Sequence, residues 1–171
     1  MISTKFIKAT QDFATYEKPV NAPYIRKSFT LEALPEKAVA TLTSTGFYRF
    51  WVNGTELTAS RLAPCITNPD DIIFYDTYDV AKYLKEGENC FAFLLGNGMS
   101  NSIGGFIWDF DKALFRSAPK LAFAFEAETG EQKMCFEADE SFKCAPSPIY
   151  FDDLRSGEFY DATKEKDGWN L

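Results

Sequence analysis

The chain has 171 residues, a formal net charge of -7 and no histidine, and 16% of its residues are aromatic. This length fits one domain with a real hydrophobic core rather than two full-sized domains. The missing histidine excludes nucleophile systems that use a His base and zinc sites with a His ligand, and the acidic balance argues against nucleic acid or an acidic membrane surface as a partner.

Residues 1–22 are expected to form an extended lead-in, with one apolar pair, Phe6-Ile7, that suits an edge strand. They hold no apolar segment followed by a small-residue cleavage site, so no signal peptide is visible in this chain. No apolar run in the chain approaches the roughly 20 residues that a membrane span needs. We therefore expect a soluble protein with no membrane partner, and a cytoplasmic location is favoured.

Residues 23–163 are expected to form the domain. Short runs rich in β-branched and aromatic residues alternate with turn residues, at spacings near the 8–12 residues typical of β-sandwiches. The runs that predict strands are 24–31, 36–45, 46–52, 56–57, 72–78, 89–95, 120–126, 132–138 and 142–145. Asp79 as an N-cap and Gly87 as the closing residue predict one short helix over 80–85. The sequence thus predicts an all-β protein, an antiparallel β-sandwich of the jelly-roll type with one short helix.

The stretch from Gly46 to Gly54 carries large side chains on both faces of its expected strand. One face holds Tyr48, Phe50 and Val52, which are expected in the core. The other face holds Phe47, Arg49 and Trp51. If this second face is an outer sheet surface, Trp51 is expected to face a partner domain. Asn53-Gly54 is the strongest short-range signal for a hairpin turn.

The four cysteines are scattered and include no C-x-x-C pair: Cys65, Cys90, Cys135 and Cys144. Cys90 and Cys135 lie within apolar runs, where a free cysteine behaves as a small hydrophobic residue. Reduced thiols are therefore expected rather than a disulfide framework.

Several motifs resemble one known family when they are taken together. They are Gly46-Phe47-Tyr48 with Val52-Asn53-Gly54, Asp79 with residues 84–89 (Leu-Lys-Glu-Gly-Glu-Asn), residues 95–98 (Leu-Gly-Asn-Gly), and residues 157–162 (Gly-Glu-Phe-Tyr-Asp-Ala) with Gly168-Trp169. The chain resembles the N-terminal β-sandwich domain of bacterial α-L-rhamnosidases, an inverting glycoside hydrolase family, from about Phe6 to Trp169. It departs from that pattern at Met99, where the family often has an aromatic residue, and at Thr163, where it often has arginine.

The resemblance implies a galactose-binding-domain-like jelly roll that is a non-catalytic accessory domain. The family's catalytic acids lie in a separate helical barrel, and no part of this chain matches it, so the chain alone is not expected to be an enzyme. The implied partner is the catalytic helical-barrel domain of the same parent chain, with residues 164–171 as the C-terminal linker toward that missing domain. The candidate interdomain residues are Trp51, Glu158, Tyr160, Asp161 and Trp169.

A rhamnose-containing saccharide is the candidate ligand, and its binding asks for an aromatic face with amides and carboxylates on loops. The candidate residues are Asn97, Asn101, Trp108 and Asp109. Trp108 can instead be a core tryptophan and Asn97 a turn residue. Some sandwiches of this family bind rhamnose through calcium, for which Asp109 and Asp111, or Asp70 and Asp71, are the loop pairs available, although neither has a defined spacing. No other cofactor is expected.

Three functions stay open at this point. The first is an accessory domain with a carbohydrate site, and the alternative is a purely structural domain that packs on the catalytic barrel and has no ligand. The third is an autonomous glycosidase, which needs two carboxyl groups about 6.5–9.5 Å apart. The acids that could serve it are Asp152, Asp153, Glu158 and Asp161.

Overall fold

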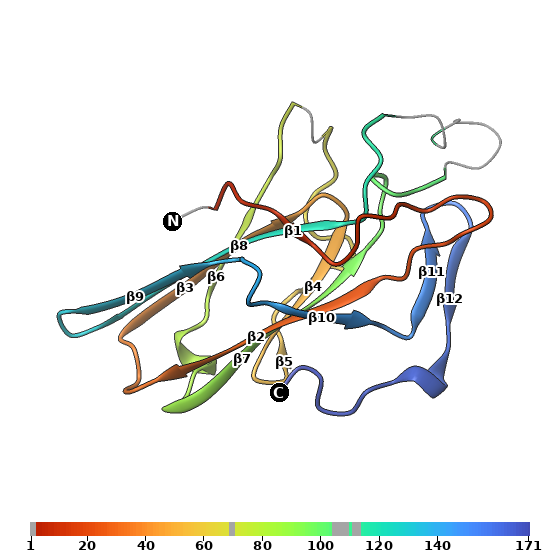
Figure 1. Ribbon diagram of the computed structural model, residues 1–171. Coiled ribbons are helices and arrows are strands. Elements are labelled where there is room, and N and C mark those ends of the chain that lie inside the picture. Colours follow the sequence, from red (N-terminus) through yellow and green to blue (C-terminus); the bar gives the residue numbers. More distant parts are fainter. Residues whose placement is uncertain (1–2, 69–70, 104–109, 111–113) are drawn as a thin grey trace.

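Two antiparallel sheets packed face to face make up most of the computed structural model, which describes residues 3–68, 71–103, 110 and 114–171 (Figure 1). Sheet A has the order β1 (Ile7–Lys8), β8 (Lys120–Thr129), β3 (Lys37–Ser44) and β6 (Asp76–Asp79), and β9 (Gln132–Glu137) also pairs with β8. Sheet B has the order β10 (Lys143–Pro146), β2 (Pro23–Leu31), β7 (Gly87–Gly96), β4 (Phe47–Val52) and β5 (Thr55–Glu56). The predicted all-β antiparallel sandwich is confirmed.

A third, two-stranded sheet lies beside the sandwich. It is the hairpin of β11 (Ile149–Asp153) and β12 (Gly157–Tyr160). The described residues also include two short 3-10 helices, η1 (Ala81–Tyr83) and η3 (Ala162–Lys164). The first of them occupies the predicted helix over 80–85, shortened to a single turn. No helix in the described part of the chain has the length and apolar character that crossing a membrane requires.

Phenylalanine rings from both sheets fill the space between them. Phe50 and Phe91 of sheet B and Phe123 and Phe125 of sheet A are fully buried. The Phe91 ring centroid lies 5.2 Å from that of Phe123 and 4.9 Å from that of Phe125. Because side chains alternate along a strand, every second residue of each strand points into this space between the sheets. Tyr48, Phe50 and Val52 lie in this core as the sequence predicts.

The outer face of sheet B is also covered, which explains why β7 is apolar at nearly every position. Its outward residues Cys90, Ala92 and Leu94 form a second cluster with Trp51. A strand that is buried on both faces needs apolar residues at consecutive positions. The prediction that residues 89–95 are such a strand is confirmed.

The turn after β4 is held by two asparagines. Asn53 and Gly54 both have positive φ, 48° and 83°, as the predicted hairpin turn requires. The Asn53 amide donates to the Asn89 Oδ1 at 2.8 Å and to the Tyr83 carbonyl at 2.9 Å. Its Oδ1 accepts from the Cys90 backbone N–H at 2.8 Å. The Val-Asn-Gly and Gly-Glu-Asn motifs, far apart in the sequence, therefore meet through one pair of side chains.

Three expectations differ from the structure. The predicted strand over 72–78 begins only at Asp76, and Ile72 and Phe74 before it are exposed. Strand β11 was not predicted, because the two prolines that precede it suggest a break in the chain. Cys135 is exposed, since it lies on the outer face of β9, although all four cysteines are free thiols as expected.

Candidate binding cleft on the outer face of sheet B

Three aromatic residues from distant parts of the sequence meet on the outer face of sheet B. Trp51 comes from β4, Tyr24 from β2 and Trp169 from the C-terminal segment. The Trp169 ring stacks on Tyr24 with centroids 3.8 Å apart and meets Trp51 edge to face at 5.1 Å. Trp51 is only 7% exposed as a result. Trp51 was expected to face a partner domain, but in this structure its cover includes Trp169 of the same chain.

One backbone and one side-chain hydrogen bond hold this C-terminal segment on the sheet. The Gly54 N–H donates to the Asn170 carbonyl at 2.8 Å, and Arg26 donates to the Leu171 carbonyl at 2.7 Å. A Cβ at Gly54 would lie 2.7 Å from the Leu171 side chain, so glycine suits both the turn and the contact. Residues 164–171 were expected to form a loose linker. In this structure the last three of them, residues 169–171, pack on the outer face of sheet B.

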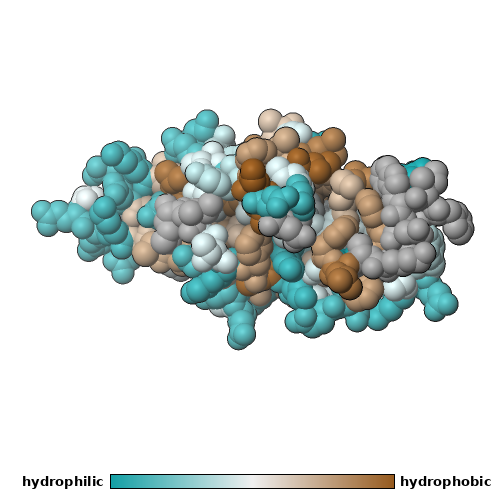
Figure 2. Space-filling model, turned by 90° about the horizontal axis from the view of Figure 1, so that it is seen from above, coloured by the Kyte–Doolittle hydropathy of each residue, from teal (hydrophilic) through white to brown (hydrophobic). Residues whose placement is uncertain are grey.

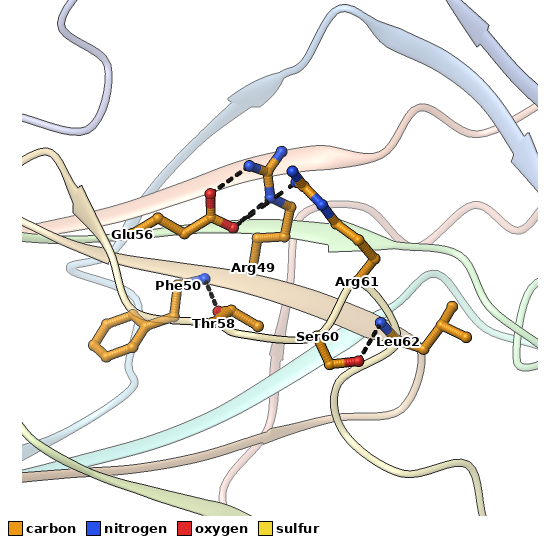
Figure 3. A network of polar contacts seen from close by, with 7 residues as sticks. All are labelled: Arg49, Phe50, Glu56, Thr58, Ser60, Arg61 and Leu62. Atoms are coloured by element: carbon orange, nitrogen blue, oxygen red, sulfur yellow. Dashed lines mark hydrogen bonds and ion pairs between the residues drawn. The ribbon is translucent and has the colours of Figure 1, made fainter.

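Two arginines line the polar side of the cleft, Arg49 and Arg61, and both contact the Glu56 carboxylate (Figure 3). Arg49 binds Glu56 through two hydrogen bonds of 2.7 and 2.5 Å, and Arg61 lies 3.9 Å from the same carboxylate. Paired hydrogen bonding from Arg49 lowers the pKa of Glu56. The Arg49 guanidinium also lies over the Trp51 ring at 4.7 Å. This network fixes a positive group at the edge of an aromatic surface.

The segment that carries Arg61 is fastened along β4. The backbone N–H of Phe50 donates to Thr58 Oγ1 at 2.7 Å, and that of Tyr48 donates to the Ala63 carbonyl at 2.7 Å. Within the segment, the Leu62 N–H donates to Ser60 Oγ at 3.1 Å. Figure 3 shows Arg49 and Arg61 directing their guanidinium groups to the same carboxylate from two segments. Arg61 itself stays 73% exposed in its side chain, so it can reach a ligand at the mouth of the cleft.

The hairpin β11–β12 forms the opposite wall of the cleft. Asp152 and Glu158 are paired across its two strands. Asp152 accepts hydrogen bonds from the Asn97 backbone N–H at 2.7 Å and from the Asn97 amide at 2.5 Å. Burial nevertheless raises the pKa of Asp152 to about 6, with the charge of Glu158 adding to the effect. Tyr160 donates to Glu165 at 2.5 Å, and this bond raises the pKa of Tyr160 to about 12.

The cleft between these walls has a volume of about 630 Å³. Its lining includes Arg49, Trp51, Trp169, Asp152, Glu158 and Tyr160. Four of the five interdomain candidates therefore lie together, namely Trp51, Glu158, Tyr160 and Trp169. The fifth, Asp161, accepts from the Thr163 backbone N–H at 3.1 Å and so caps the short helix η3. Sequence reasoning missed Arg49 as a member of this site, although its place beside Trp51 on one strand was a usable signal.

The predicted sugar-binding asparagines have internal partners instead. Asn97 and Asn101 are each 1% exposed. Besides its bonds to Asp152, the Asn97 amide donates to the Val20 carbonyl at 2.9 Å, and its Oδ1 accepts from Asn101 at 2.6 Å. Asn101 Oδ1 accepts from the Ala14 N–H at 2.7 Å. Both amides therefore hold the loop after β7 in place and do not face solvent in this structure.

The remaining ligand candidates lie outside the described residues. These are Trp108 and Asp109 for the sugar, and Asp109, Asp111 and Asp70 for calcium. Among the residues that the structure does describe, no three cysteine, aspartate or glutamate side chains gather in an arrangement suited to a metal ion.

The end of the sandwich that carries the long loops is apolar. Figure 2 looks onto this end and shows hydrophobic residues gathered among hydrophilic ones. The large side chains exposed in these loops include Leu62, Ile66, Ile72, Phe74 and Phe115. A hollow of about 660 Å³ lies among them and is lined in part by Phe47 and Met99. A surface of this kind is typical of an interaction site.

The raised pKa of Asp152 predicts a pH-dependent stability. Because the folded-state pKa is about 6 and the ordinary value is 3.8, the Asp152 contribution is fully present below about pH 4 and is lost as the pH rises through about 6. The loss should reach up to about 3 kcal/mol. Chemical denaturation of the wild type and of Asp152→Asn between pH 4 and 7 measures it, since asparagine does not titrate. Parallel stability curves for the two proteins would contradict the assignment.

Comparisons with known proteins match this chain to one family. The family model described as "Alpha-L-rhamnosidase N-terminal domain" matches residues 33–171. An α-L-rhamnosidase of Formosa agariphila is 28% identical over 154 residues, 86% of this chain and 16% of that protein. One of Streptomyces avermitilis is 31% identical over 144 residues, 80% of this chain and 13% of that protein. The chain thus spans a small part of the relatives that it matches.

Solved structures agree with the sequence comparisons. The Streptomyces avermitilis α-L-rhamnosidase complexed with L-rhamnose superposes with a TM-score of 0.79 at 28% identity, covering 89% of this chain and 15% of that one. The Dictyoglomus thermophilum α-L-rhamnosidase gives 0.78 at 28% identity, covering 99% and 19%. The Aspergillus terreus enzyme gives 0.87 at 23% identity, covering 97% and 19%, and supports the fold.

Proposed function

Since the chain belongs to the α-L-rhamnosidase N-terminal domain family, we propose that it is a non-catalytic accessory domain of an α-L-rhamnosidase and binds a rhamnose-containing saccharide in the outer-face cleft. The parent enzyme is proposed to carry its catalytic acids in a helical-barrel domain outside residues 1–171. The relatives, of which this chain spans 16% or less, have ample length for such a domain.

The observation that carries the proposal is the combination of rings and charges in one cleft. A sugar ring offers apolar C–H groups on its faces and hydroxyl groups around its rim. Trp169, which packs on the nearly buried Trp51, offers aromatic surface, while Arg49 and Glu158 offer a donor and an acceptor beside it. The cleft volume of about 630 Å³ falls inside the about 300–1,000 Å³ range of small-molecule sites. It is large enough for one or two sugar units.

The internal hydrogen bonds of the hairpin acids favour a structural role for these carboxylates rather than a catalytic one. Asp152 is held by Asn97, and Asp153 accepts from the Ser102 hydroxyl at 2.5 Å and from the Arg155 N–H at 2.9 Å. Carboxylates engaged in this way stabilise the hairpin, whereas an inverting glycosidase needs an acid and a base that face a substrate and a water. Purified chain is expected to leave an aryl rhamnoside unhydrolysed. Hydrolysis that is lost in Glu158→Gln would instead support the autonomous glycosidase.

Titration with rhamnose and methyl rhamnoside, with and without calcium, tests the binding proposal. Isothermal calorimetry should show binding by the wild type. Replacing Trp169 by alanine should weaken it at least about ten-fold, the equivalent of about 1.4 kcal/mol, because the aromatic floor is lost. Leu34→Ala is the matched control, since Leu34 is 60% exposed in the turn after β2. Absence of heat together with absence of NMR shifts at Trp51 and Trp169 would refute saccharide binding in this cleft.

A second candidate function rests on the apolar loop end of the sandwich. Exposed Ile66, Ile72 and Phe74 are typical of a surface that another domain covers. They favour a structural domain that packs on the catalytic barrel and has no ligand of its own. This function predicts no saccharide binding, so the same titration separates the two candidates.

A further inference from the structure

In the hairpin β11–β12, the outer edge of β12 pairs with no other described strand. Within the described ranges, β12 pairs with β11 and with no other strand, and β11 with β12 alone. In Figure 1 the hairpin stands beside the sandwich and β12 is its outermost strand. A two-stranded sheet is marginal in water, and an unpaired strand edge presents backbone donors and acceptors to any extended segment that approaches it.

The inner side of this hairpin is firmly attached. Asp152 accepts from Asn97, Asp153 accepts from Ser102, and the Ala22 N–H donates to the Ile149 carbonyl at 3.1 Å. These contacts all involve β11. The free edge is therefore presented by a rigid support, which lowers the conformational entropy that an incoming strand must lose.

The hairpin also carries partly exposed aromatic side chains, and Lys164 of η3 lies 5.7 Å from the ring centroid of one of them, Tyr150. Phe159 is 53% exposed and Tyr150 is 39% exposed. Their ring centroids are 5.9 Å apart, and the Phe151 ring lies 5.2 Å from that of Phe159. Alternation along β12 places Phe159 on the face opposite Glu158 and Tyr160, which line the cleft. This aromatic face is thus separate from the saccharide site.

We propose that the hairpin β11–β12 docks an extended strand from the part of the parent α-L-rhamnosidase that lies outside residues 1–171. The strand adds to the free edge of β12 and packs its side chains beside Phe159. The inference rests on the proposed function in one respect, that the chain is one domain of a larger enzyme. The solved relatives contain that additional chain, since this one covers only 15% and 19% of two of them.

Charge favours such a segment over a second copy of this chain. Each copy carries a formal charge of -7, and β12 itself carries Glu158 and no basic residue. Pairing two β12 edges would bring the Glu158 side chains of two acidic copies close together, and like charges are unfavourable across strands. The fitting partner is a strand with apolar residues at alternate positions and lysine or arginine between them.

Amide hydrogen exchange of the full-length parent and of the 171-residue chain tests the docking. Exchange at residues 157–160 should be at least about 100-fold slower in the parent, because a paired edge is protected from opening. The control is β9 (Gln132–Glu137), also an edge strand, whose exchange should be equal in the two proteins. Equal exchange at residues 157–160 overturns the proposal. Protection that rises with the concentration of the 171-residue chain also overturns it, by showing self-association.

A pair of variants tests the aromatic face. Phe159→Ser in the parent should restore fast exchange at residues 157–160, whereas Leu34→Ser, on an exposed turn elsewhere, should not. Unchanged circular dichroism of Phe159→Ser shows that the variant is folded. Slow exchange that persists in Phe159→Ser contradicts the aromatic contact. Saccharide titration of the 171-residue chain is a separate readout, so failure of the docking and failure of the proposed function remain distinguishable.

Discussion

Replacing Phe91 by alanine should lower the free energy of unfolding by about 3–5 kcal/mol. Phe91 is fully buried, and its ring contacts those of Phe29, Phe50, Phe123 and Phe125 at centroid distances between 4.7 and 5.8 Å. Alanine leaves a cavity that rings from two sheets line, and those rings are fixed by their own neighbours. Urea denaturation should show a lower midpoint and an unchanged slope.

Leu34→Ala is the matched control for that experiment. Leu34 is 60% exposed, so its truncation should change the unfolding free energy by no more than about 0.5 kcal/mol. A loss below about 1 kcal/mol in Phe91→Ala would mean that the core collapses around the missing ring. That result would contradict the tightly packed interface between the sheets.

Replacing Asn89 by alanine should cost about 3 kcal/mol. The Asn89 side chain is 1% exposed and makes four hydrogen bonds. Its Oδ1 accepts from the Lys85 N–H and the Asn53 amide, and its amide donates to the Lys85 and Gly87 carbonyls, all at 2.7–3.0 Å. Alanine leaves these buried groups without partners, so the turn after β4 and the start of β7 both loosen.

Thermal and chemical denaturation of Asn89→Ala and of the exposed Asn68→Ala measure this effect. Asn68→Ala should stay within about 0.5 kcal/mol of the wild type. Asn89→Asp keeps the acceptors but loses the amide donors, so it should be destabilised as well. Equal stability of Asn89→Ala and Asn68→Ala would show that the hydrogen bonds of Asn89 contribute nothing to the free energy of unfolding.

The parts of the fold that follow from neighbouring residues could be predicted from the sequence. Alternating Tyr48, Phe50 and Val52 identified the core face of β4, and Asn53-Gly54 identified the turn, because strand period and turn conformation are local properties. The nearly continuous apolar run of residues 89–95 likewise identified a strand covered on both sides. These predictions needed no knowledge of which strands are neighbours.

The candidate site depended on contacts between residues that are distant in the sequence. Trp169 covers Trp51 across more than a hundred residues, and the sequence of the C-terminal segment, polar with one tryptophan, indicated a loose linker. The sequence around Asn97 suited a turn residue as well as a sugar site, and it did not indicate that Asp152 and Val20 are the partners of the Asn97 amide. The burial of Trp51 and Asn97 depends on how whole elements pack against each other, and a local sequence pattern carries no information about that packing.

The order of strands in the two sheets also decides when this domain can fold during synthesis. Ile7 in β1 pairs with Leu121 in β8, and Tyr24 in β2 pairs with Ala145 in β10. Neither sheet can be completed until most of the domain has left the ribosome, which at about 5–20 residues per second means a delay on the order of ten seconds. During that interval the phenylalanine-rich strands have no opposite sheet. Slow closure of non-local pairs is expected for such a topology, so the nascent chain is the state in which the apolar faces of these strands stay exposed for longest.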